Sequence, residues 1–468
     1  MEIKTLEFTN WSGQYKSNPG IYAIPETAED LQEIVRNKEK FPSPLVAIGS
    51  GHSNSGCNIV NGGTAVYMKK FHYINEPLLR RDSGEQPSSD EVTVGAGMQL
   101  FEIHRFLAER KMQLPFTPEI GNATIGSVAC CCLKDAAIGE SSGIATKMIK
   151  AIRFIDANAN NRTMKRGDEE WEIMMSSHGL FFIIYEVVLD VLPMKLVIQN
   201  YVSSNVHNKD WETVYRKALA ENDGIFGLVN ASTGKFIFET RNFSKVPGKP
   251  GSIENFYNKL DQNVFKYFNP IMGAVETIWW SRMIRNVAIA GFGFMKLSFP
   301  NGRRTFKNLK PIDYSYHYRW RWDFHFWAYP VSTFPNVVLP AFIKFLKEYK
   351  QQHPDFDEKG LMACYRIRVE NKALLSPSHD EERMTLDPLR PVTKNQKLMA
   401  AWDQFCYAYN EFAVQHGGKC TFNQTKVLTK QQVEKAFGEK WERFRKARET
   451  ADPRNRFLSN YFKELMYG

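Results

Sequence analysis

A glycine turn followed by a histidine is the stretch of this chain with the clearest chemical capacity. Residues 46–48 form a short apolar strand, and Gly49, Ser50, Gly51 and His52 come directly after it. Glycines let a backbone turn tightly and approach a ligand, and consecutive amides in such a turn can form an anion-binding nest. The spacing matches neither G-x-G-x-x-G nor G-x-x-x-x-G-K-[ST], and an ordinary surface turn is the alternative. The stretch therefore predicts a phosphate-like group beside one imidazole.

The elements that must position this turn follow along the chain. Residues 27–35 begin a helix, with Thr27 as a plausible N-cap. Residues 91–97 alternate like a strand and end in glycines, and residues 100–108 carry apolar side chains at helical spacing. An extended segment rich in proline and glycine covers residues 114–127, and a turn before a long apolar strand covers residues 177–189. Short strands alternating with a few helices predict an α+β fold and argue against a doubly wound nucleotide fold.

Taken in this order, the stretches resemble the FAD domain of the vanillyl-alcohol-oxidase-type (PCMH-type) flavoproteins, nearest the sugar-1,4-lactone and alditol oxidase branch. That branch carries G-x-G-H-S, A-G, T-x-G-G and G-x-x-G-x-I-x-x-V-x-L, and the resemblance covers roughly residues 15–195. The tail at residues 452–462 is similar to the family's closing D-P-x-x-x-F-x-N-x-Y segment. The resemblance implies a two-subdomain FAD-binding domain at 1–195, an α+β substrate cap at 196–425, and a C-terminal segment at 426–468 that packs on the FAD domain.

The resemblance also implies the cofactor contacts. FAD carries two phosphates, which glycine-rich backbone amides satisfy, and a ring that accepts a hydride equivalent. His52 stands where relatives attach the flavin 8α-methyl covalently, whereas the position of a second, cysteinyl link is Asn122 here, so only one link is expected. The implied contacts are Gly49, Ser50, Gly51, His52, Ser53, Asn54, Pro118, Gly121, Thr124, Gly126, Ser127, Cys130 and Ile184. No metal ligand is expected.

Three adjacent cysteines, Cys130, Cys131 and Cys132, replace the small Ser, Thr or Gly residues usual in the family. We interpret them as tight packing near the flavin, with a reactive thiol as the alternative. Pro118 lies near a position where relatives that react quickly with oxygen carry Gly or Pro, which favours an oxidase.

The substrate residues depart from the family pattern. The family strand E-x-R before L-S-P has Cys364 in place of its glutamate but keeps Arg366. In the family's G-G-R-P-H-W-G-K, the histidine and lysine are Thr421 and Gln424 here. Those groups normally orient a polyol and help to remove the hydroxyl proton, so their loss argues against a simple sugar lactone.

Other side chains must then supply the catalytic groups. Tyr365, His325 or His317 could act as the base, although each is also typical of a packed or hydrogen-bonded position. Arg366 could stabilise developing negative charge, with a structural, ion-paired arginine as an equal alternative. Phe422 and the aromatic run at residues 314–330 favour a larger, less polar substrate, with core packing as the other reading of the run.

Composition narrows the function classes. The chain has 468 residues, 43% hydrophobic and 24% charged, as in ordinary globular proteins, and 61 Lys and Arg residues face 51 acidic ones. The basic residues are dispersed, so we expect no nucleic-acid partner. Seven cysteines suit neither a disulfide framework nor a zinc site, and no signal peptide or membrane span is seen, so we expect a cytoplasmic protein of unknown oligomeric state.

We therefore expect an FAD-dependent oxidase. It would transfer a hydride from a C–OH or C–N bond of a small organic substrate to FAD held covalently through His52, and reduce O2 to H2O2. A flavin dehydrogenase of the aldonolactone type, which uses another electron acceptor, is the main alternative. A basic binding protein without enzymatic activity is the third.

Overall fold

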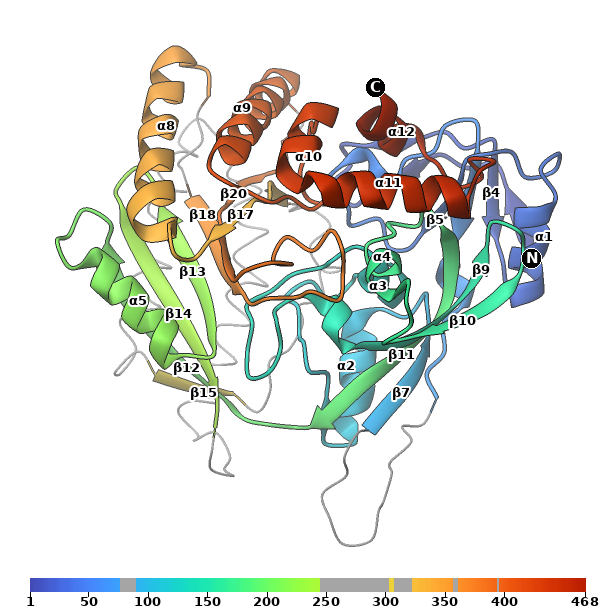
Figure 1. Cartoon of the computed structure of the whole chain (residues 1–468), viewed down its shortest axis with the longest axis horizontal. Helices are drawn as coiled ribbons and strands as arrows, with labels where there is room; N and C mark the ends of the chain where they lie inside the picture. Colours follow the sequence, from blue (N-terminus) through green and yellow to red (C-terminus); the bar gives the residue numbers. More distant parts are fainter. Residues whose placement is uncertain (76–89, 245–302, 307–321, 357–360, 394) are drawn as a thin grey trace, which may run out of the picture.

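In the computed structural model, the described residues form three larger β-sheets, a two-stranded sheet and the helices beside them (Figure 1). The structure describes residues 1–75, 90–244, 303–306, 322–356, 361–393 and 395–468. His317 and much of the aromatic run therefore fall outside the described residues. Within the described part, no helix has both the length and the apolar character needed to cross a membrane.

The first sheet carries the glycine turn. Its order is β1 (Glu2–Lys4), β4 (Ile21–Ile24), β6 (Thr64–Tyr67), β5 (Leu45–Ile48), and the last three strands run parallel. Helix α1 (Ala28–Arg36) connects β4 to β5 and begins, as predicted, at Thr27, whose side chain accepts from the Asp30 N–H in a capping box. The residues between β1 and β4 form a separate two-stranded antiparallel pair, β2 (Phe8–Thr9) and β3 (Lys16–Ser17).

The second sheet is antiparallel and supports the other side of the turn. It comprises β10 (Asn161–Lys165), β9 (Ile149–Asp156), β11 (Phe182–Pro193) and β7 (Asp90–Gly95), with β8 (Met112–Gln113) paired to β11. Strand β11 is the predicted long apolar strand and is buried along most of its length. The helices of this region are α2 (Leu100–Glu109), α3 (Ile125–Cys130) and α4 (Trp171–Met174).

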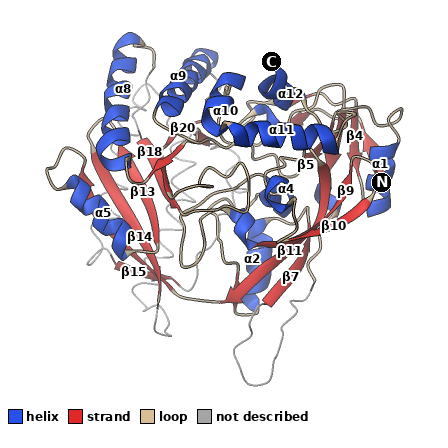
Figure 2. Cartoon of the chain, viewed as in Figure 1, coloured by secondary structure: helices blue, strands red, loops and turns tan. Residues whose placement is uncertain are grey.

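The third sheet forms the body of the predicted cap. Its strands are β12 (Val197–Asn205), β13 (Gly224–Asn230), β14 (Lys235–Phe243), β15 (Arg303–Phe306), β16 (Trp322–Phe324), β17 (Ala328–Pro330), β18 (Leu361–Ile367), β19 (Arg383–Thr385) and β20 (Asp387–Pro391). Helices α5 (Trp211–Glu221), α8 (Leu339–Gln352) and α9 (Gln396–Gln415) lie beside it (Figure 2). Aromatic pairs such as Phe342 and Tyr409, whose ring centroids are 5.1 Å apart, join α8 to α9.

The C-terminal segment runs back to the first sheet through α10 (Lys430–Phe437), α11 (Glu439–Ala451) and α12 (Asn460–Tyr467) (Figure 1). Arg456 fixes this return because its guanidinium donates to the carbonyls of Ile34 and Val35 at the end of α1. The Leu45 N–H donates in turn to the Arg456 carbonyl at 2.8 Å. The strand that leads into the glycine turn is thus held by the end of the chain.

Short helical turns complete the described structure. Turns of 3-10 type lie at Gly56–Asn58, Met68–Lys70 and Ala145–Met148, and a π-helical turn, Phe334–Val338, leads into α8.

Candidate functional site

A pocket lies between the first two sheets and the returning C-terminal segment. It encloses about 1230 Å³ of space, including its open mouth, and is lined by β5, the turn after it, parts of residues 120–133 and 178–184, and residues 423–424 and 457–459. The lining contains no Asp, Glu, Lys or Arg side chain. A bound anion would therefore be held by backbone amides and hydroxyl groups and would meet no repelling carboxylate in the lining.

The glycine turn at the pocket leaves no room for side chains. A Cβ on Gly49 would lie 1.9 Å from Thr124 Oγ1, and one on Gly51 would lie 2.9 Å from the Phe8 ring. Gly51 also has a φ of +72°, a left-handed conformation that favours glycine. The Trp11 N–H donates to the Gly51 carbonyl at 2.8 Å and fixes the turn. Both glycines are therefore required by close packing of the turn against Thr124 and Phe8, and the predicted approach to a ligand stays a prediction.

Several polar atoms that line the pocket are buried and have no partner among the described residues. Burying a polar atom without a hydrogen bond costs about 1–3 kcal/mol, so a folded protein rarely gathers several of them unless a ligand or ordered water satisfies them. The atoms are His52 Nδ1, Asn58 Oδ1, His178 Nδ1, Asn423 Oδ1 and Ser459 Oγ. The set combines groups that can donate with groups that can accept, which suits a large ligand carrying both kinds of group.

His52 is a neutral imidazole held in one orientation. Burial lowers its pKa from 6.5 to about 4, so the ring is uncharged at neutral pH. The Trp11 ring stacks on it, with centroids 5.1 Å apart and an interplanar angle of 29°. A neutral ring has an available nitrogen lone pair, and here one unpartnered nitrogen belongs to a side chain that lines the pocket.

His178 is a pocket residue that the sequence analysis missed. Its φ of +47° is unusual for a residue other than glycine, and burial lowers its pKa to about 3. The ring meets Phe422 edge to face at 5.1 Å, and its backbone N–H donates to the Cys130 carbonyl at 3.1 Å. The sequence signalled a turn at residues 177–179, but nothing local showed that the side chain lines the pocket.

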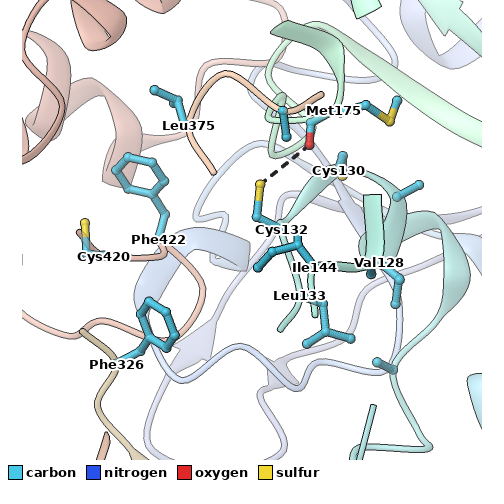
Figure 3. Packing of buried hydrophobic residues seen from close by; sticks show 14 of the residues in the cluster. Val128, Cys130, Cys132, Leu133, Ile144, Met175, Phe326, Leu375, Cys420 and Phe422 are labelled. Carbon is cyan, nitrogen blue, oxygen red and sulfur yellow. Dashed lines mark hydrogen bonds between the residues drawn. The ribbon is translucent and has the colours of Figure 1, made fainter. Parts of the chain in front are cut away.

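The three adjacent cysteines divide between two environments. Cys130 and Cys131 line the pocket, whereas Cys132 lies outside the lining, is 1% exposed, and has its Sγ 3.8 Å from the Met175 carbonyl (Figure 3). Cys130 is buried as well, at 7% exposure, and only Cys131 is partly exposed. All seven cysteines of the chain are free thiols.

Most of the cofactor contacts implied by the resemblance meet at this pocket. Those in the lining are Gly49, Ser50, Gly51, His52, Ser53, Thr124, Gly126, Ser127, Cys130 and Ile184. Asn54, Pro118 and Gly121 lie outside it. The Asn54 N–H donates to the Asn423 carbonyl, and the Gly121 carbonyl accepts from the Phe101 N–H, so both hold neighbouring loops in place. Pro118 is buried beside them.

Arg366 has structural partners away from the pocket. Its Nη1 donates to the carbonyls of Leu219 and Asn222 at 2.8 and 2.9 Å, and its Nη2 lies 3.1 Å from Glu382 Oε2. This is the structural, ion-paired arrangement that the sequence left open as the alternative. Arg366 is not in the pocket lining, and no observation supports its predicted contact with the flavin or a substrate oxygen.

His325 also lies outside the lining and has both ring nitrogens occupied. Its Nε2 is 2.7 Å from Asn410 Oδ1, and its Nδ1 accepts from the Lys426 N–H at 3.2 Å. Burial lowers its pKa to about 4. A buried imidazole with two partners is typical of a core histidine, so the structure favours the packed reading over the base.

Tyr365 points the other way from Arg366 because successive side chains of a strand face opposite sides of the sheet. Its hydroxyl donates to Glu119 Oε2 at 3.1 Å, and Lys134 Nζ lies 3.6 Å from its ring centroid. Lys134 in turn pairs with Asp387. The two catalytic candidates on β18, Tyr365 and Arg366, therefore cannot serve one site, and Tyr365 is the one that faces the FAD-binding region.

This group of Tyr365, Glu119, Lys134 and Asp387, the interface cluster, adjoins the pocket. Ile120 and the residue before Lys134 are both in the pocket lining. Burial, followed by the nearby Asp135 carboxylate, raises the pKa of Glu119, and burial raises that of Asp387. Asp387 Oδ1 is buried and has no partner among the described residues. The cluster thus offers a base of raised pKa and one open acceptor.

Known protein families and solved structures match the chain. Two family models match the chain, one described as FAD binding domain over residues 19–162 and one as D-arabinono-1,4-lactone oxidase over residues 345–465. Cholesterol oxidase from B. sterolicum has the same fold, with a TM-score of 0.70, 14% identity, and coverage of 99% of this chain and 97% of that one. The two matches and the shared fold fit the vanillyl-alcohol-oxidase-type FAD-binding flavoproteins that the sequence resembles. The matched FAD binding domain indicates a flavoprotein, and the predicted α+β PCMH-type fold is confirmed.

The relatives are distant. L-gulonolactone oxidase from Mus musculus is 21% identical over 99% of both chains. D-arabinono-1,4-lactone oxidase from Eremothecium gossypii is 24% identical, and the match spans 44% of this chain and 38% of the relative. The flavoprotein thus matches about two fifths of the length of that curated relative.

The residues of the pocket fit FAD. The glycine turn suits the close approach of a diphosphate, and the unpartnered donors and acceptors suit a ring with carbonyl and N–H groups. Gly49, Ser50 and Thr124 would hold the diphosphate, and His52, His178 and Asn423 would meet other parts of the cofactor.

Proposed function

We propose that this flavoprotein is an FAD-dependent oxidase that takes a hydride from a C–OH or C–N bond of a small organic substrate and passes the electrons to O2, forming H2O2. The main support for the proposal is the set of unpartnered polar atoms in the uncharged pocket. A large cofactor with both hydrogen-bond donors and acceptors would satisfy them. The match to the lactone oxidase model supports oxidase chemistry. When bound, FAD supplies the hydride-accepting and electron-releasing chemistry.

A flavin dehydrogenase remains the alternative because Pro118, on which the preference for oxygen was based, is buried outside the lining. The test is to reduce the purified protein anaerobically with substrate and then admit air. Rapid return of flavin absorbance together with stoichiometric H2O2 supports the oxidase. Slow reoxidation in air and fast reoxidation by an artificial quinone would establish the dehydrogenase.

We further propose that His52 attaches the flavin covalently. The support is geometric and electrostatic: a neutral, stacked imidazole in the pocket has a buried nitrogen with no protein partner. The absorbance of the protein before and after acid precipitation tests this link. Yellow colour that stays with the pellet supports it, and colour released to the supernatant contradicts it while leaving the oxidase proposal intact.

For the proton of the substrate hydroxyl, we propose Tyr365 and Glu119. A substrate O–H that donates to the Tyr365 oxygen lets the phenolic proton move along the existing 3.1 Å hydrogen bond to Glu119. The raised pKa of Glu119 makes this carboxylate a stronger base than an exposed one. Lys134, over the Tyr365 ring, would stabilise negative charge that develops there.

The proposed substrate is larger and less polar than a simple sugar lactone. The family's glutamate, histidine and lysine are Cys364, Thr421 and Gln424 here, and Cys364 and Thr421 are buried. A peroxide-release screen with L-gulono-1,4-lactone, xylitol, and a set of aromatic and lipophilic alcohols and amines tests this. Turnover that is fastest with the lactone or xylitol would contradict the substrate proposal.

A further inference from the structure

Cys130 and Cys131 form a pair of thiols that the proposed reaction does not use. Their Sγ atoms lie 3.8 Å apart at the end of α3. The hydrogen bond between the two thiols lowers the pKa of Cys130, and those with Ser177 and the Gly179 backbone act in the same direction, against the opposing effect of burial. The same hydrogen bond raises the pKa of Cys131, so one sulfur of the pair has increased thiolate character.

The covalent geometry of adjacent residues keeps this pair from closing into an ordinary disulfide. Consecutive Cα atoms are about 3.8 Å apart, whereas a relaxed disulfide needs about 4.4–6.8 Å between its Cα atoms. The sulfurs are also much farther apart than a bonded pair. A single atom placed between them avoids both problems, because it bonds to each sulfur without drawing the two together.

The pocket gives such an atom access and restricts its nature. Both thiols are in the lining, and Cys131 is partly exposed. Within the described ranges, no group of three or more His, Cys, Asp or Glu side chains is arranged to hold a metal ion. The ligand must therefore be satisfied by two thiolates and must be soft, since thiolates select soft partners.

We propose that Cys130 and Cys131 form a dithiol site for soft thiophilic ligands, of which trivalent organoarsenicals are the matching class, and that FAD covers this site when it fills the pocket. With phenylarsine oxide, the arsenic–oxygen bond is replaced by two arsenic–sulfur bonds, and the two thiol protons leave with the oxygen as water. Arsenic stays trivalent, so no oxidant or reductant is needed. A chain modified in this way cannot take up its cofactor.

The experiment uses the full-length protein, produced in a host limited for riboflavin so that flavin-bearing and flavin-free chains coexist. The native mixture is treated with phenylarsine oxide, excess reagent is removed, and intact masses are measured. We expect about one arsenical on each flavin-free chain and at least about tenfold less on flavin-bearing chains, because FAD in the pocket would block the path to the partly exposed Cys131 and to the buried Cys130 behind it. If the flavin is not covalent, the same comparison is made between FAD-saturated and FAD-depleted samples, so the result does not depend on His52.

Two serine variants identify the pair. Cys131→Ser leaves one thiol, and losing the second attachment should weaken arsenical binding by about 10²–10⁴-fold. Alkylation of Cys130 by iodoacetamide and uptake of FAD should persist, which shows that the variant is folded. Cys57→Ser is the matched control, because Cys57 is another thiol of the same pocket lining and lies outside the adjacent pair. Its arsenical binding should equal that of the parent protein.

Three results would overturn the proposal: flavin-free chains without adduct, equal labelling of flavin-bearing and flavin-free chains, or loss of labelling in Cys57→Ser but not in Cys131→Ser.

Discussion

The FAD pocket and strand β18 of the cap were both expected to hold functional residues. They differ in whether the polar atoms of those residues have partners within the protein. In the pocket, buried polar atoms of His52, His178 and Asn423 have no partner among the described residues. In the cap, His325 has both ring nitrogens occupied, and Arg366 has both of its Nη atoms occupied by protein, although its buried Nε has no partner among the described residues. A side chain whose polar atoms are already satisfied has little left for a ligand.

The contrast shows which departures from the family pattern matter. The pocket keeps the family's glycines and histidine, and its chemistry is incomplete without a cofactor. On β18 the change from glutamate to Cys364 removed a polar group, and that cysteine is fully buried. The free acceptor of Asp387 and the hydroxyl of Tyr365 lie instead in the interface cluster. The proposed proton transfer through Tyr365 would therefore place substrate chemistry on the opposite face of the strand from Arg366.

The largest expected effect is at the pocket. His52→Ala should abolish acid-stable flavin entirely, because no carbon–nitrogen link can form, while FAD still binds reversibly to the turn. The measurement is flavin absorbance in the pellet and the supernatant after acid precipitation. His178→Ala is the matched control, since it removes a second buried imidazole of the same pocket. Acid-stable flavin that persists in His52→Ala and disappears in His178→Ala would assign the link to His178 instead.

The next comparison sets the two faces of β18 against each other. Tyr365→Phe should slow flavin reduction by substrate by about 10²-fold, the lower range for a lost acid–base group, with unchanged flavin content. Arg366→Gln should leave that rate within about twofold but reduce the free energy of unfolding by about 1–3 kcal/mol, because two buried carbonyls lose their donor. Stopped-flow absorbance and urea unfolding measure the two quantities. The opposite pattern would restore Arg366 as the catalytic group.

The same contrast between the pocket and β18 separates what the sequence could predict from what it could not. The glycine turn, the helix from Thr27 and the long strand β11 are set by local patterns, so their positions were predicted. The sequence did not predict which side of the sheet Tyr365 and Arg366 each face, because this depends on how β18 pairs with β13 and β20. Glu119 and Lys134 lie more than 200 residues from Tyr365, and no local signal connects them. The direction of His178 likewise depends on the packing of Phe422 against it.

A smaller effect is expected from the glycine turn. Gly49→Ala would place a methyl group against Thr124 Oγ1, and displacing that hydroxyl should weaken FAD binding by about tenfold, or about 1.4 kcal/mol. Gly56→Ala is the control, because its added carbon would meet Tyr461 only at 3.5 Å, an ordinary contact. Fluorescence titration of flavin-free protein with FAD gives both affinities. Equal affinities would mean that the turn does not approach the cofactor.

The last effect is a pH dependence of stability that arises from His178. Burial holds its pKa near 3 in the folded protein, whereas an unfolded histidine titrates at 6.5. Between these values the unfolded chain binds the extra proton, so stability falls as the pH drops below 6.5, by up to about 1.4 kcal/mol per pH unit for this group. Above pH 6.5 both states are neutral and the contribution vanishes.

Urea unfolding between pH 6.5 and 4.5 measures this contribution as the slope of the unfolding free energy against pH. The slope should therefore be shallower in His178→Phe than in the parent protein, and it should not change in the exposed control His207→Gln. An unchanged slope in His178→Phe would mean that His178 gains a proton in the folded pocket, which would contradict its role as a neutral partner of the cofactor.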